Sequence, residues 1–117
     1  MSKRDTRLYL MDILESALAI QSFTTGLSFE QFCNDRKTTS AVIREFEIIG
    51  EAVAKLPDDL KAKRSDIMWN DIKDFRNILI HEYFGIDMEI VWNVIQDDLP
   101  VLIHAVNELL SIESVDQ

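Results

Sequence analysis

Apolar residues recur every three or four positions along most of the chain, the spacing that places them on one face of an α-helix. From about residue 5 to residue 21 the apolar stripe consists of Leu10, Ile13, Leu14, Ala17 and Ile20. A more regular stripe between residues 38 and 56 consists of Val42, Phe46, Ile49, Val53 and Leu56. The pattern predicts two long amphipathic helices, the second with a coiled-coil-like seam.

The segment between these two helices carries signals for a break and a short helical turn. Thr24-Thr25-Gly26 interrupts the periodicity, and Ser28 is a residue type that caps helix N-termini. We expect the turn that follows to carry its apolar side chains inward, namely Phe29, Phe32 and Cys33. Cys33 is interpreted as a small core residue, and as the single cysteine it cannot form an internal disulfide, which fits a reducing cytoplasm.

Glycine and proline punctuate the second long helix. Gly50 in its interior costs roughly 1 kcal/mol relative to alanine, which predicts that a neighbouring helix packs closely at this position. Pro57 cannot continue the helix, so Pro57-Asp58-Asp59 is interpreted as its end and the start of a short polar connection.

Two further helices are predicted in the second half of the chain. Asp66 is a candidate cap for a third helix and Gly85 its expected stop; the buried stripe comprises Trp69, Ile72, Phe75 and Leu79. Asp87 is a candidate cap for a fourth helix, whose stripe comprises Val91, Ile95, Leu99, Leu102, Val106 and Leu109. Pro100 should kink this helix, because its ring collides with the carbonyl of Gln96.

Four amphipathic helices without an alternating strand pattern predict an all-α fold, an antiparallel four-helix bundle with a short additional helix. The length of 117 residues predicts a single domain over 1–117. A net charge of -9 argues against nucleic-acid binding through bulk electrostatics, so any contact with RNA must rest on a local site. No long apolar run indicates a signal peptide or a membrane span, and we expect a cytoplasmic protein with no membrane contact.

Side chains that can act on a phosphate are concentrated between residues 75 and 85. Arg76 offers a permanently charged planar fork of donors, and polar Asn77 follows it. His81 can exchange a proton near pH 7, and Tyr83 carries a phenol that can donate a hydrogen bond or be modified. This grouping makes the stretch the candidate site of chemistry.

Each of these residues also has a purely structural interpretation. Arg76 could form an ion pair with an acid such as Asp74 or Glu82. His81 alone is more often a satisfied surface or core residue, and Tyr83 alone an amphipathic edge of the core. On an ideal helix, with ~100° per residue, Arg76 and Tyr83 lie about 20° apart, whereas His81 lies about 140° from Arg76. Convergence therefore needs either a helix that loosens before Gly85 or a second copy of the chain beside the first.

The spacing of Arg76, His81 and Tyr83 reproduces the R-x4-H-x-Y signature of the HEPN superfamily and resembles in particular the HepT-like toxins of two-gene toxin–antitoxin systems. The similarity covers essentially the whole chain. Besides the motif itself, it includes Ile49-Gly50-Glu51-Ala52, Trp69, the segment 81–87 and Val91-Trp92.

This resemblance implies a metal-independent endoribonuclease that acts as a homodimer and needs no cofactor. It assigns catalysis to Arg76 and His81 and a supporting, RNA-binding place to Asn77 and Tyr83. It also implies a partner, an MntA-type nucleotidyltransferase antitoxin that transfers AMP from ATP to the tyrosine at position 83.

The residue chemistry is consistent with RNA cleavage on independent grounds. RNA carries its own nucleophile, the 2′-hydroxyl, so no metal is needed to activate water. His81 could take that proton, and Arg76 could stabilise charge on the phosphate oxygens. The leaving 5′-oxygen then lacks an acid, which the second His81 of a dimer could supply. His104 is interpreted as structural, and the acidic residues show no metal-ligand spacing with a histidine.

Two alternatives from other functional classes remain open at this stage. The chain could be a non-catalytic helical dimer that only docks its nucleotidyltransferase. It could also be a nucleotide-binding regulatory bundle in which Arg76 holds a phosphate without cleavage.

Overall fold

The computed structural model describes residues 2–81 and 87–115, with the side chains of residues 78, 80, 81 and 113–115 left out. Within these ranges the chain is helical and contains no strand, which confirms the all-α prediction. The elements are α1 (Lys3–Thr24), α2 (Phe29–Asn34), α3 (Arg36–Lys55), α4 (Asp58–Ala62), α5 (Trp69–His81), α6 (Met88–Asn93), the π-helical turn η1 (Val94–Asp98) and α7 (Leu99–Val115).

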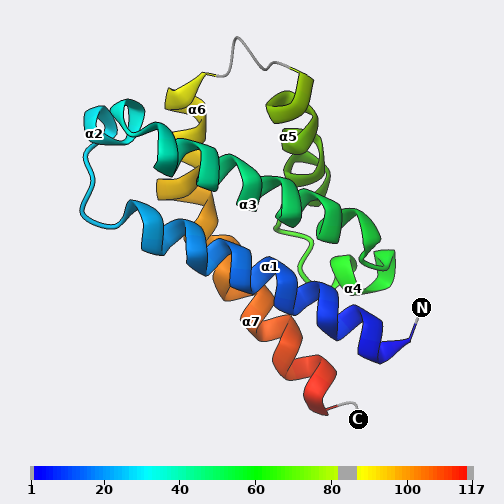
Figure 1. Cartoon of the computed structure of the whole chain (residues 1–117). Coiled ribbons are helices and arrows are strands. Elements are labelled where there is room, and N and C mark those ends of the chain that lie inside the picture. The colour runs from blue at the N-terminus through cyan, green and yellow to red at the C-terminus, as the bar shows by residue number, and fades with distance from the viewer. Residues whose placement is uncertain (1, 82–86, 116–117) are drawn as a thin grey trace.

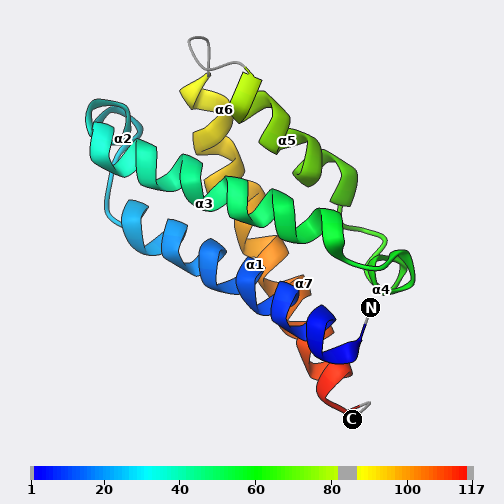
Figure 2. The same cartoon turned by 45° about the vertical axis from the view of Figure 1, so that its right-hand side comes forward.

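The long helices form two antiparallel pairs that cross each other. Helices α1 and α3 lie side by side and run in opposite directions, and α5 and the α6–α7 segment cross this pair (Figures 1 and 2). Helix α5 packs on α3, and α7 packs on α1. The α3–α5 contact is the one that positions the candidate motif.

Serine caps begin the first two helices. The Ser2 hydroxyl accepts a hydrogen bond from the Asp5 N–H at 3.1 Å. Ser28 and Gln31 form a reciprocal capping box, with hydrogen bonds of 3.1 and 2.9 Å, which confirms the predicted cap. Phe32 is fully buried, but the expectation for Cys33 is wrong, because it lies one position further around this short helix and is exposed.

The aromatic residues of α2 meet a tryptophan of α6. Phe29 is 40% exposed, so the prediction that it points fully inward is also wrong. Its ring lies 6.1 Å from that of Trp92, and the Phe32 ring lies 5.2 Å from the same tryptophan. Helix α2 therefore docks on α6 through a small aromatic cluster.

Helix α3 starts earlier than the periodicity predicted. Asp35 caps it by accepting hydrogen bonds from the Thr38 N–H at 3.2 Å and the Thr38 hydroxyl at 2.7 Å. All five residues of its predicted stripe are buried. After Pro57 the expected polar connection is instead the short helix α4, because Leu60 provides one buried anchor within it.

The predicted cap of the third helix is wrong. Asp66 lies in the turn before α5, and its carboxylate binds the Arg64 guanidinium through two contacts of 2.9 Å. Helix α5 begins at Trp69, whose indole N–H donates to the carbonyls of Lys61 and Arg64 at 3.2 and 3.1 Å. A buried aromatic anchor therefore sets the start of this helix, where a capping carboxylate was expected.

The fourth predicted helix is one helical run with a widened turn. Asp87 caps it through the Glu89 N–H at 2.9 Å, as predicted. The N–H of Leu99 donates to the carbonyl of Val94, five residues back, directly before Pro100. A kink was predicted at Pro100; what the structure shows is a π-helical turn directly before it, a common way to accommodate a break in the hydrogen-bond ladder without ending the helix.

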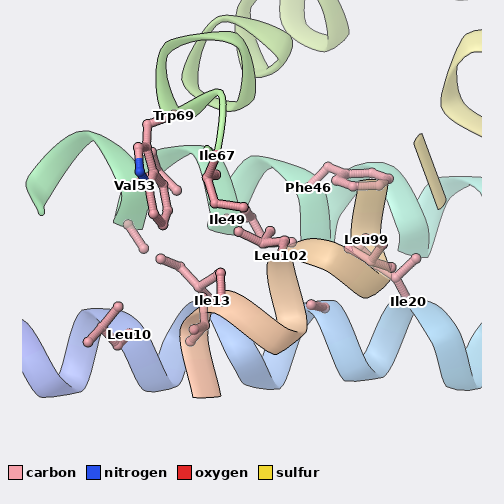
Figure 3. Close-up of a cluster of buried hydrophobic side chains, with 14 of the residues drawn as sticks. Leu10, Ile13, Ile20, Phe46, Ile49, Val53, Ile67, Trp69, Leu99 and Leu102 are labelled. Carbon is pink, nitrogen blue, oxygen red and sulfur yellow. The ribbon is translucent and has the colours of Figure 1, made fainter. Parts of the chain in front are cut away.

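The core lies where α1, α3, the start of α5 and α7 converge. Figure 3 shows Leu10, Ile13 and Ile20 of α1 facing Ile49 and Val53 of α3, with Trp69, Leu99 and Leu102 closing the cluster. The stripe of the α6–α7 run is buried throughout, as predicted. None of the described helices is long and apolar enough to cross a membrane.

Candidate active site

Arg76 lies at the closest approach of α5 to α3. A Cβ atom placed on Gly50 would sit 2.8 Å from the Cβ and 3.3 Å from the Cδ of Arg76. A distance under 3.0 Å leaves no space for a further carbon atom, so only glycine permits this contact without a shift. The prediction that Gly50 marks a close helix contact is confirmed, and the partner is the candidate catalytic arginine.

An aromatic pair fixes the same junction one turn of α3 away. The rings of Phe46 and Phe75 meet edge to face, with centroids 5.2 Å apart and planes at 89°. Phe75 directly precedes Arg76, so the contact fixes the rotation of α5 about its axis at the position of the arginine.

The charged end of Arg76 pairs with a residue of α3. Its Nη2 lies 3.5 Å from Oε1 of Glu51, and the Arg76 side chain is 38% exposed. The partner that the structure shows is therefore Glu51 and not Asp74, one of the two acids considered from the sequence; the other, Glu82, lies outside the described residues. The Nε atom is buried and has no hydrogen-bond acceptor among the described residues, so its stem is fixed by packing.

The structure describes the remaining motif residues only in part. Asn77 is exposed on α5 directly after Arg76. His81 is the last residue of α5. Its side chain lies outside the described part of the chain, and so does all of Tyr83. Because α5 is helical from Arg76 to His81, the two positions stay about 140° apart around the axis.

An apolar groove borders the motif helix. It has a volume of about 510 Å³ and lies between α5, α3 and the η1–α7 segment. Carboxylates surround it at Asp66, Asp71, Asp74 and Asp98. We call it the α5–α7 groove; its apolar lining includes Phe46, Ile49, Met68, Ile72, Phe75 and Val101.

A polar network ties the turn before α5 to α7. Nη1 of Arg64 lies 2.8 Å from Glu108, whose other carboxylate oxygen lies 3.0 Å from Nε2 of His104. The hydrogen bonds from Arg64 hold the pKa of the Asp66 carboxyl below its ordinary value. His104, interpreted as structural from the sequence, is thus an exposed member of this network. No cluster of metal-ligating side chains occurs among the described residues.

The contact between Glu51 and Arg76 is not predicted from the sequence. The sequence pattern marks Gly50 as a close contact and Arg76 as a catalytic candidate, but it does not connect the two. The signal was present as a carboxylate directly after a helix-interior glycine, but its partner is 25 positions further along the chain, and only the helix packing identifies it.

Sequence comparisons find proteins of one ribonuclease family that are similar to most of this chain. Residues 13–109 match the family described as ribonuclease HepT-like. A candidate RNase of Methanocaldococcus jannaschii is 47% identical over 90 residues, which cover 77% of this chain and 74% of that protein. The protein named probable ribonuclease HepT in Thermococcus cleftensis is 44% identical over 88 residues, covering 75% and 80%.

A longer alignment extends this similarity to nearly the full length. A candidate RNase of Caldanaerobacter subterraneus is 41% identical over 107 residues, which cover 92% of this chain and 96% of that protein. No solved structure gives a significant match. The family match over residues 13–109, together with these relatives, shows that this chain belongs to the HepT-like ribonuclease family.

Proposed function

We propose that this HepT-like protein is the toxin of a toxin–antitoxin pair, a metal-independent endoribonuclease that cleaves RNA through Arg76 and His81. The observation that carries the proposal is the placement of Arg76. Its stem is packed against Gly50 and its guanidinium reaches the surface, where an RNA phosphate could meet it. A guanidinium in this position offers two coplanar N–H donors, and the oxygens of a phosphate can accept a hydrogen bond from each.

The proposed reaction uses the nucleophile that RNA itself carries. The 2′-oxygen loses its proton to His81 and bonds to phosphorus, while the bond from phosphorus to the 5′-oxygen breaks. The products are a 2′,3′-cyclic phosphate and a 5′-hydroxyl, whose proton comes from a second acid. Arg76 stabilises the negative charge that grows on the phosphate oxygens. No metal is required for any of these steps.

A homodimer would provide the second acid. Positions 76 and 81 lie on different faces of one continuous helix, and this separation supports a dimer as the arrangement that brings an arginine and a histidine to one phosphate. In a two-fold dimer, Arg76 and His81 of facing subunits would line one cleft. The α5–α7 groove supports this proposal, because its apolar lining extends along α5 as far as Phe75, the residue before Arg76.

The antitoxin would act on Tyr83. We propose that an MntA-type nucleotidyltransferase transfers AMP from ATP to the Tyr83 hydroxyl, with release of pyrophosphate. The added group brings bulk and a negative charge close to Arg76 in the sequence motif, which would repel the phosphates of RNA. The modified protein would then be the inactive form, in a cytoplasmic toxin–antitoxin pair.

The test is RNA cleavage in EDTA by the purified, unmodified protein. We expect cleavage by the wild type and a loss of at least about 100-fold in Arg76→Ala and His81→Ala, because each removes a group that acts in the transition state. Dimer content and melting temperature are matched beforehand. No cleavage by a wild type shown by mass to be free of AMP would overturn the proposal and favour a docking role instead.

A further inference from the structure

Glu51 is the one described carboxylate that reaches the candidate catalytic arginine, and it does so from a different helix. The Glu51 side chain is 58% exposed, and its Oε1 lies 3.5 Å from Nη2 of Arg76. Gly50, its neighbour in the sequence, contacts the stem of the same arginine. Two consecutive residues of α3 therefore contact Arg76 at both ends of its side chain.

The two contacts constrain different parts of Arg76. Packing against Gly50 fixes Cβ, Cγ and Cδ, and the buried Nε is held in the same interface. The Cδ–Nε bond still lets the planar guanidinium turn as a unit, and the contact with Glu51 restrains that turn. The stem is therefore fixed by packing, and the direction of the terminal nitrogens is restrained by the carboxylate of Glu51.

We infer that Glu51 is a positioning residue, which orients the guanidinium of Arg76 for the phosphate undergoing cleavage. The inference rests on the proposed ribonuclease function for its kinetic consequence, and on the α3–α5 contact for its geometry. Glu51 acts through Arg76 and does not itself take or give a proton. Its pair with Arg76 is single, long and partly exposed, so an RNA phosphate can share the guanidinium without a large barrier.

The kinetic test compares Glu51→Gln with the wild type on a defined RNA oligonucleotide. We expect kcat to fall about tenfold, because a misdirected donor stabilises the transition state less well. Affinity for an oligonucleotide with a 2′-deoxy scissile position should not weaken, since a negative charge near the phosphate has been removed. Glu51→Asp should recover part of kcat, because it restores the carboxylate.

Glu47→Gln is the matched control. Glu47 lies on the same helix and pairs at 3.6 Å with Arg44, an arginine outside the motif. This variant should retain wild-type kcat and stability. A double variant separates the possible roles of Glu51: in an Arg76→Lys background, Glu51→Gln should have little further effect on kcat, because the group through which it acts is already lost.

A second readout does not depend on cleavage. Rotation about the Nε–Cζ bond of Arg76, followed by NMR of its guanidinium nitrogens, should be slow in the wild type and fast in Glu51→Gln. If rotation is equally fast in both proteins, the inference is overturned whether or not the protein cleaves RNA. An additive loss in the Arg76→Lys background, or removal of the acidic limb of the pH–kcat profile by Glu51→Gln, would also overturn it, because Glu51 would then act directly.

Discussion

At the scale of single residues, the close contact between Gly50 and Arg76 depends on the absence of a methyl group at position 50. The Cβ of an alanine at position 50 would lie 2.8 Å from the Cβ of Arg76, which is anchored in the α5 backbone. The atom in the way belongs to the base of a side chain and cannot swing aside. Space for the catalytic candidate is therefore created on a helix that carries none of the signature motif.

Gly50→Ala should lower the free energy of unfolding. Alanine is favoured over glycine within a helix by about 1 kcal/mol, but overpacking a helix interface costs about 1–3 kcal/mol, and we expect the second effect to prevail. Urea unfolding measures the change. Ser40→Ala, at an exposed position of the same helix, controls for helix propensity and should be neutral or stabilising. A stabilised Gly50→Ala would show that α5 can move away from α3 at little cost.

Tyr83 is the residue at which the proposed control by the antitoxin can be tested. Incubation with the cognate nucleotidyltransferase and ATP should raise the mass of the protein by whole AMP units and stop RNA cleavage. Tyr83→Phe lacks the acceptor hydroxyl and should show no mass gain. Tyr9→Phe removes the other tyrosine of the chain. As a control, it should be modified like the wild type. A mass gain in Tyr83→Phe would place the modification elsewhere.

At the scale of single elements, capping side chains mark the start of α1, α2 and α3. The hydroxyl and N–H of Thr38 donate to the Asp35 carboxylate, and these hydrogen bonds hold the pKa of Asp35 below its ordinary value of 3.8. A lowered pKa in the folded state means that the charged cap stabilises the fold above the unfolded-state pKa. That contribution is lost as the pH falls through the folded-state pKa.

Asp35→Asn should therefore reduce the pH dependence of stability at the acid end. We expect the wild type to melt higher than the variant near neutral pH, and the difference to shrink as the pH falls below about 4. Thermal melts followed by circular dichroism across this range measure it. Asp12→Asn, at an exposed position inside α1, should leave the acid dependence unchanged. A constant difference between wild type and Asp35→Asn at every pH would rule out the charged cap.

Element boundaries also show where sequence reasoning succeeded and where it failed. Ser28 and Asp87 are caps that local sequence can predict, because each accepts a hydrogen bond from a backbone N–H within the next three residues. Asp66 has the same local signature, yet it binds Arg64, which is held in turn by Glu108 of α7. Glu108 lies 44 positions after Arg64, so the contact that holds the partner of Asp66 is invisible to the local sequence pattern.

At the scale of the whole molecule, the α5–α7 groove is the surface that a second copy would cover. Val101 on α7 is 49% exposed at its edge, and Met68 before α5 is 65% exposed. Exposed apolar side chains around an open groove favour association, because burying them removes apolar surface from water. The four aspartates around the groove oppose association, because those of the two copies would repel each other. Added salt screens this repulsion and should therefore strengthen the dimer.

Val101→Asp should dissociate the proposed dimer. A carboxylate in this groove would have to be desolvated on association, which is costly without a paired cation. Sedimentation velocity across a concentration series measures the change. Leu18→Asp, 47% exposed on α1 and outside the groove, should leave association unchanged. If only Leu18→Asp produces monomers, the interface lies on α1 and the groove has another occupant.

The sequence by itself determined the all-α class, the signature residues and most positions of the buried stripes, although the predicted Leu14, Ile72 and Phe75 are only partly buried. Helical periodicity is a local property, and each helix follows from the residues within it. The tertiary structure decided what those residues meet. Arg76 is fixed by Gly50 and Glu51, Trp69 sets the start of α5, and Cys33 turns outward although it is apolar. These outcomes depend on contacts between helices, whose crossing and rotation are set by the packing of the whole core.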